Sequence, residues 1–231
     1  MIKLYFYGFD YLFIISIAIT LIAQVYISSS YSKYKKVKIT KEITGFEVAR
    51  KILDKNGLKD VHVVSINGSL SDHYDPTRRV VRLSKEVFEG STVAAVAVAA
   101  HEVGHAIQDK EGYTFMRIRS KIVPTVNFCS KIGYIVLLIG WIFGELQLAY
   151  VGIALLCATL IFQLVTLPVE FNASNRAKKE IEKLDMLNSD EKNGMSRMLT
   201  SAALTYVASL TTTLLQIFRL FLIVANNRDK N

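Results

Sequence analysis

The chain has few of the residues from which small cross-linked scaffolds are built. Its 231 residues include only two cysteines, Cys129 and Cys157, and these do not form a CxxC pair. This pattern excludes a disulfide framework and a cysteine-based zinc site, so both thiols are expected to be free. Prolines number three and histidines four. Internal repeats and low-complexity segments are also missing.

Positive charge is in excess, with a net charge of +8 at pH 7. Most of the lysines and arginines fall within residues 33–131 and 176–197. Because no aromatic-and-basic binding module accompanies them, we expect no nucleic-acid partner. A basic face beside membrane spans is instead expected to meet the anionic headgroups of the lipid bilayer.

Hydrophobic residues make up 51% of the chain and gather into four blocks, at about 11–28, 126–143, 148–167 and 202–225. These lengths predict about four transmembrane helices. Lysines follow the first block at once, which by the positive-inside rule places the N-terminus outside. A short turn at 144–147 makes the second and third blocks a membrane hairpin, and Pro168 is expected to end the third. Arg219, inside the fourth block, is expected to extend to the membrane surface.

Between the first two blocks lies a region of soluble character. Thr44 and Glu47 have the spacing of a capping box, which predicts a helix that ends at Asn56-Gly57. Residues 61–66 and 80–83 are β-rich, and Asn67-Gly68 between them is a hairpin signal. The expected fold class is therefore α+β, mainly α: an integral membrane protein with a cytoplasmic domain that contains a small antiparallel sheet.

The motif His101-Glu102-Val103-Gly104-His105 follows an alanine- and valine-rich run. Residues i and i+4 share one face of a helix, so both imidazoles can reach one metal ion. Glu102 then lies about 100° around the helix, where it can act as general base on a metal-bound water. The alternative is an amphipathic core helix with two hydrogen-bonded histidines. The run before the motif is too short to span a bilayer, so the helix is expected to be buried in protein.

A catalytic zinc requires a third protein ligand and one open position. Since no histidine follows His105, this ligand must be a carboxylate or one of His62 and His73. Glu170 is a strong candidate, because small residues after it would allow a helix to pack closely against the motif. The alternative is that Glu170 merely stabilises the start of a helix beginning at Pro168.

Six segments together are far more specific than the five-residue motif. They are 31–34 (YSKY), 44–50 (TGFEVAR), 71–76 (SDHYDP), 81–84 (VRLS), 99–108 (AAHEVGHAIQ) and 167–171 (LPVEF). Through these segments the chain resembles, over nearly its whole length, the bacterial membrane-bound neutral zinc metallopeptidases of the YugP type. That family is similar in arrangement to the HtpX and prenyl-protease group of membrane gluzincins.

The resemblance implies one Zn2+ per chain, with His101, His105 and Glu170 as ligands and Glu102 as base. It also implies a multi-pass protein of the bacterial plasma membrane with its catalytic part in the cytoplasm. Asn172 stands where this family is expected to have an aspartate, so an amide replaces a charge there. The expected division is an anchor (1–30), a cytoplasmic zincin-like part (31–123), a transmembrane hairpin (124–168), a cytoplasmic helical part (169–200) and a C-terminal transmembrane helix with a short tail (201–231).

The expected function is zinc-dependent hydrolysis of peptide bonds in peptides or membrane proteins. Candidate stabilisers of the oxyanion are His73, Tyr74 and Arg176, with Tyr113 and Tyr206 as further possibilities. Asn172 and Ser174 are candidates for contacts with the metal ligands. Substrate is expected to add as a strand beside residues 80–83, unless that strand is already paired within the domain.

Two alternatives to this function remain at this point. An intramembrane zinc protease would complete its site with a downstream aspartate, but Asp185 lies in a charged segment that does not fit a span. The other alternative is a non-catalytic membrane scaffold or lipid-binding protein with a structural or vestigial metal site. The presence of Glu102 argues against it, because a structural site needs no base.

Overall fold

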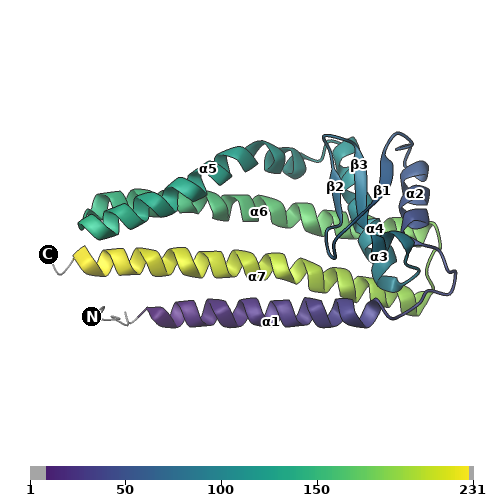
Figure 1. Cartoon of the computed structure of the whole chain (residues 1–231), viewed down its shortest axis with the longest axis horizontal. Coiled ribbons are helices and arrows are strands. Elements are labelled where there is room, and N and C mark those ends of the chain that lie inside the picture. The colour runs from purple at the N-terminus through teal and green to yellow at the C-terminus, as the bar shows by residue number, and fades with distance from the viewer. Residues whose placement is uncertain (1–8, 229–231) are drawn as a thin grey trace. The chain divides into compact units, whose positions relative to one another are not determined.

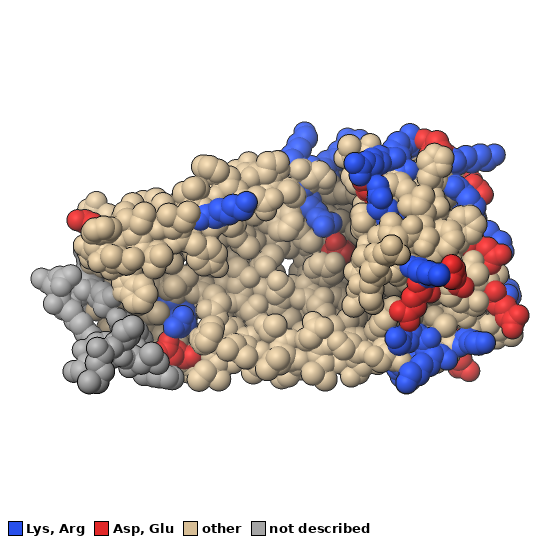
Figure 2. Space-filling view, in the orientation of Figure 1, with Lys and Arg blue, Asp and Glu red and all other residues tan. Residues whose placement is uncertain are grey.

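A computed structural model describes residues 9–228 (Figure 1). The chain is mainly helical and contains one small sheet. Four helices are long and apolar enough to cross a membrane: α1 (Asp10–Tyr34), α5 (Thr114–Phe143), α6 (Leu146–Lys183) and α7 (Ser189–Arg228). This agrees with the four predicted spans. Figure 2 shows that charged side chains are sparse over these long helices and gather over the shorter elements.

The residues form two units, which are described separately. The first is helical and contains, of the described residues, 9–24, 118–166 and 205–228. Within it, α5 and α6 are antiparallel neighbours that are joined by a turn at Gly144. Their backbones approach closely because both carry small residues: a Cβ at Gly140 would lie 2.5 Å from the Ala149 nitrogen. Such contacts between small residues are the usual way in which helices associate in lipid.

Polar contacts also hold this helical unit together. Arg219 of α7 forms an ion pair with Asp10 of α1 and lies over the ring of Phe13. The arginine therefore has a carboxylate partner within the unit. The sequence had predicted only that Arg219 extends to the membrane surface, and it did not predict this partner.

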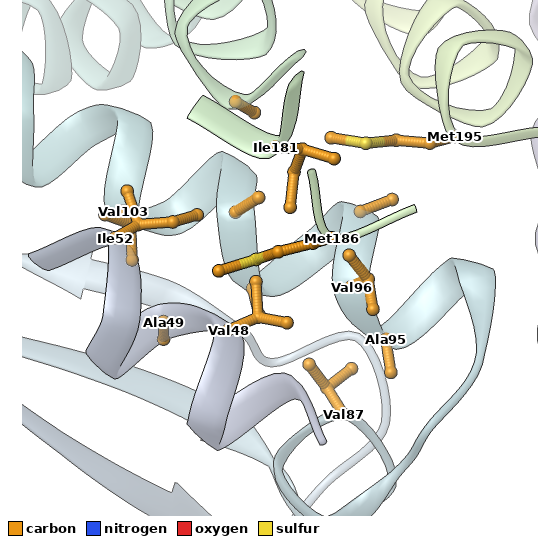
Figure 3. Close-up of a cluster of buried hydrophobic side chains, with 14 of the residues drawn as sticks. Val48, Ala49, Ile52, Val87, Ala95, Val96, Val103, Ile181, Met186 and Met195 are labelled. Atoms are coloured by element: carbon orange, nitrogen blue, oxygen red, sulfur yellow. The ribbon is translucent and has the colours of Figure 1, made fainter. Parts of the chain in front are cut away.

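The second unit, residues 25–117 and 167–204, holds the main hydrophobic core. Its central element is α4 (Val93–Lys110), capped by the hydroxyl of Thr92 and buried along most of its length. Around it pack α2 (Gly45–Lys55), α3 (Lys85–Glu89) and the parts of α6 and α7 that belong to this unit. Figure 3 shows Val48, Ile52, Val96, Met186 and neighbouring side chains converging in this core. The predicted capping box at Thr44 and Glu47 is confirmed.

The sheet of the second unit differs from the prediction. It has the order β1-β3-β2, formed by β1 (His62–Ile66), β2 (His73–Asp75) and β3 (Val80–Ser84). β1 pairs parallel with β3, whereas β2 pairs antiparallel with it. The predicted purely antiparallel sheet and the hairpin at Asn67-Gly68 are therefore wrong. The most buried strand, β3, lies in the middle, where both of its faces and both of its edges are covered.

Pro168, which was expected to end the third apolar block, lies inside a helix, and so does a second proline. Pro124 lies within α5 and Pro168 within α6. A proline lacks one backbone donor, but apolar helices tolerate it when neighbouring contacts support the helix. Pro168 therefore does not start a new helix, and Glu170 is not a helix-start residue.

Candidate metal centre

The two motif histidines extend from the same face of α4. His101 and His105 lie one turn apart, with ring centroids separated by 4.8 Å and planes nearly perpendicular. His105 is buried, and His101 is partly exposed. Because α4 is rich in alanine, other helices can approach it closely. This approach allows a ligand from another element to reach the two rings.

The third group comes from α6, which crosses α4 at Gly104. A Cβ at Gly104 would lie only 2.6 Å from the Ala173 carbonyl oxygen, so no larger residue fits there without a shift. The small residues that follow Glu170 in the sequence therefore pack against the motif. This contact brings the Glu170 carboxylate, which is 3% exposed, to the two imidazoles.

Three ligand atoms converge in the described part of the chain. Glu170 Oε2 lies 3.3 Å from His101 Nε2 and 3.7 Å from His105 Nε2, and all three ligand atoms lie within 4.8 Å of one another. Ligand bonds of about 2.0–2.1 Å in a tetrahedral zinc site place neighbouring ligand atoms about 3.3 Å apart. Two nitrogens and one oxygen at these distances fit zinc and leave a fourth position.

The charges within this triad attract one another. Burial alone would raise the pKa of Glu170, but its contacts with His101 and His105 hold that pKa below its usual value. Burial would lower the pKa of His105, yet the nearby carboxylate of Glu170 raises it overall. The carboxylate is therefore kept in its charged form, which is the form that can bind a metal ion.

Each imidazole is held by a second residue through Nδ1. Ser174 Oγ lies 3.1 Å from His101 Nδ1, and Gln108 Oε1 lies 2.9 Å from His105 Nδ1. Gln108 is completely buried, and its Nε2 donates to the Val169 carbonyl and to Asn172 Oδ1. Since both of these groups are acceptors in this arrangement, the amide can face only one way. Gln108 Oε1 must then accept from Nδ1–H of His105, which leaves Nε2 of that ring free to bind metal.

The sequence interpretation missed Gln108. It lies three residues after His105, on the same helical face, and is the polar residue that follows an apolar stretch. That i, i+3 spacing was the available signal. Asn172 was predicted to lie near the ligands, and it contacts Gln108 and accepts from Arg176 Nε at 2.7 Å.

Glu102 points toward the sheet. Its Oε2 accepts a hydrogen bond of 3.0 Å from the backbone N–H of Tyr74 in β2. The Tyr74 hydroxyl donates to Asp109 at 2.9 Å, and burial together with this bond raises the pKa of the phenol. The hydroxyl proposed as an oxyanion stabiliser is thus committed to Asp109, while the backbone of the same residue orients Glu102.

The remaining candidates lie outside the ligand triad. His73 is exposed and its Nδ1 lies 2.8 Å from the Ser71 carbonyl oxygen, and His62 is exposed on β1. Arg176 pairs with Glu111 at 2.7 Å and reaches the site only through Asn172. Asp185 is exposed and pairs with lysines. The strand at residues 80–83 is paired on both sides, so the expected addition of substrate beside it is wrong.

Comparisons with known proteins identify the family of the chain. The family described as "putative neutral zinc metallopeptidase" matches residues 9–225. A relative from Bacillus subtilis (strain 168), named "putative membrane protease YugP", is 47% identical over 223 residues, which cover 96% of this chain and 99% of the relative. No solved structure matches. The chain therefore belongs to the neutral zinc metallopeptidase family, as a membrane protein.

Proposed function

We propose that the chain is a membrane-bound, zinc-dependent endopeptidase of the gluzincin type that binds one zinc ion per chain. The observation that carries this proposal is the triangle of ligand atoms from His101, His105 and Glu170, with Glu102 one residue from the first ligand. Two helices build this triangle around a Gly104–Ala173 contact that only small residues allow.

Zinc bound to these three residues would lower the pKa of a water molecule and polarise the carbonyl of the scissile peptide bond. Glu102 would accept a proton from the attacking water and would transfer it to the leaving amine. The Tyr74 N–H holds Glu102 Oε2, so Oε1 remains for the proton. Gln108 and Ser174 keep the imidazoles oriented, which reduces the movement needed during the reaction.

The substrate is proposed to be a peptide or membrane-protein segment that lies along β2. This strand is an outer strand of the sheet, and its central residue, Tyr74, directly contacts Glu102. An added strand forms hydrogen bonds through its backbone, so its binding depends little on the side chains of the peptide. We expect broad specificity with a preference for extended segments.

The position in the cell is also part of the proposal. The basic residues that follow α1 and those at 176–183 indicate that the metal site faces the cytoplasm, with the N-terminus outside the bacterial plasma membrane. The lysine- and arginine-rich surface is proposed to contact lipid headgroups, and no nucleic-acid partner is proposed. The division at 1–30, 31–123, 124–168, 169–200 and 201–231 remains the proposed domain organisation.

The test compares Glu102→Gln with the wild type and with the control Glu182→Gln, whose glutamate is exposed on α6. Zinc content and cleavage of casein or a fluorogenic peptide are measured on full-length protein in detergent. We expect all three proteins to hold one zinc and only Glu102→Gln to lose cleavage, by about 100-fold or more. Equal cleavage by all three, or zinc binding without cleavage by the wild type, would contradict the proposal and favour a non-catalytic scaffold.

A further inference from the structure

The helical unit contains a cavity, with both apolar and polar walls, that no part of the peptidase mechanism uses. Its volume is about 390 Å³, and it lies between α5, α6 and α7. Apolar side chains such as Phe162 and Val126 form part of its wall. The polar part of the wall includes Arg119, Asn127, Gln163, Thr166, Tyr206 and Ser209. We call this cavity the polar pocket.

Two polar groups of the polar pocket lack hydrogen-bond partners among the residues that the structure describes. Thr166 is 5% exposed, and its Oγ1 is buried without a partner. Gln163 Nε2 bonds Ser209 Oγ at 3.0 Å and Thr213 Oγ1 at 2.9 Å, while its Oε1 is buried without a partner. Burying such groups is costly, so each side chain gains by turning its polar group toward a ligand in the cavity.

The hydrogen-bonding capacity of these groups is adaptable. The Thr166 hydroxyl can donate or accept. Because the Ser209 and Thr213 hydroxyls can also do either, the Gln163 amide can turn either end toward the cavity. The two groups can therefore donate to ester carbonyls. Arg119 adds a permanent positive charge to the same wall.

A cation, two neutral hydrogen-bonding groups and an apolar wall match the interfacial part of a phospholipid. A transmembrane helix does not fit, because one turn of a helix about 10 Å wide already occupies roughly 400 Å³. Its backbone groups are also satisfied internally and would leave Thr166 and Gln163 unpaired. A phospholipid requires no unfolding to enter and is abundant around any membrane-spanning helix.

We propose that the polar pocket binds one glycerophospholipid, with its phosphate at Arg119 and its ester carbonyls at Thr166 and Gln163. The acyl chains then leave along the apolar wall at Phe162 and Val126. The bound lipid links α5, α6 and α7 and stabilises the helical unit. This site is independent of the zinc chemistry, so it persists in a protein without cleavage activity.

The test uses the full-length chain, purified in detergent and washed to remove loosely held lipid. Native mass spectrometry and a phosphorus assay count the phospholipids retained per chain, and thermal unfolding is followed while phosphatidylglycerol is added. The variants are Thr166→Val and Gln163→Leu, together and singly. Thr125→Val is the matched control, since Thr125 is an exposed threonine of α5 outside the pocket wall.

We expect the wild type and Thr125→Val to retain about one phospholipid per chain and to unfold at higher temperature when it is added. The double variant loses two hydrogen bonds and is expected to bind about tenfold or more weakly. Arg119→Gln is expected to remove the preference for phosphatidylglycerol over diacylglycerol. Circular dichroism and gel filtration confirm that each variant is folded.

Three results would overturn the proposal. Folded wild-type protein with far less than one phosphorus per chain would mean that only water fills the cavity. Equal retention by the double variant and the control would place the lipid elsewhere. Equal stabilisation of the wild type by diacylglycerol and phosphatidylglycerol would show that the phosphate does not contribute to binding.

Discussion

The contact between Gly104 and Ala173 sets the distance between α4, which carries the two motif histidines, and α6, which supplies Glu170. In Gly104→Ala, the new methyl group would lie 2.6 Å from the Ala173 carbonyl oxygen, whereas ordinary contact begins at 3.4 Å. The helices must therefore move apart by about 0.8 Å. Zinc ligand distances vary by only about 0.2 Å between good sites, so this shift is large for the triad.

Two effects of this substitution oppose each other. Alanine is favoured over glycine inside a helix by about 1 kcal/mol, which would stabilise the protein. Overpacking of a close contact costs about 1–3 kcal/mol. Since the contact is with rigid backbone atoms, we expect the steric cost to equal or exceed the gain and zinc affinity to fall by about tenfold to hundredfold.

The assay is competition for zinc between the protein and a chromophoric chelator, with thermal unfolding measured on the same samples. The double variant Gly104→Ala/Ala173→Gly is the matched control, because it leaves the backbone of residue 173 in place and should remain as weak in zinc binding. Unchanged zinc affinity in Gly104→Ala, or rescue in the double variant, would refute this explanation of how the triad is built.

Other perturbations test other contacts. Gln108→Leu removes the acceptor of His105 Nδ1 and should weaken zinc binding by about tenfold or more in the same competition assay, whereas Gln108→Glu, which keeps an acceptor, should bind zinc more tightly than the leucine variant. Burial opposes ionisation of Glu191, but backbone hydrogen bonds lower its pKa below the usual 4.5, so its stabilisation is present above pH 4.5 and lost as the pH falls through the lower folded value. Glu191→Gln should therefore cost about 1–3 kcal/mol in urea unfolding at pH 7 and much less at pH 3; an equal cost at both would contradict this. Arg219→Leu leaves Asp10 without its ion-pair partner and should destabilise the chain by about 3 kcal/mol in thermal unfolding, with Asp10→Asn added to restore part of the loss.

Much of the candidate metal site was predictable, because two of its residues lie close together in the sequence. The i, i+4 spacing of His101 and His105 requires only a helix, and alanine-rich flanks predict that this helix is buried. Glu170 is more distant in sequence, but the small residues after it indicated close helix packing. Its role as the proposed third ligand also rests on the family resemblance.

The sheet was mispredicted because strand order is a non-local property. Asn67-Gly68 is compatible with a tight turn, yet the chain continues through β2 before β3 returns beside β1. The apolar sequence of β3 indicated burial, and a fully buried strand belongs in the centre of a sheet. Local turn chemistry carries no information on which neighbours such a strand takes.

The prediction that Pro168 ends a helix was wrong for a related reason. Proline usually ends a helix, but Pro168 is embedded in α6 between an apolar segment and the packed turn at Ala173. Neighbouring contacts therefore outweigh the local cost. The contact between the Tyr74 backbone N–H and Glu102 was not predicted, because a backbone N–H leaves no trace in the side-chain pattern.

Tyr74 joins the edge of the sheet to α4 at two positions, Glu102 and Asp109, which are seven residues apart. The side chain and the backbone N–H of Tyr74 thus connect β2 to two successive turns of α4. A peptide lying on that edge would meet a proton acceptor that is already in place. The positions of the proposed substrate and of the proposed base then depend on the same part of the molecule, so a change that loosens one would also loosen the other.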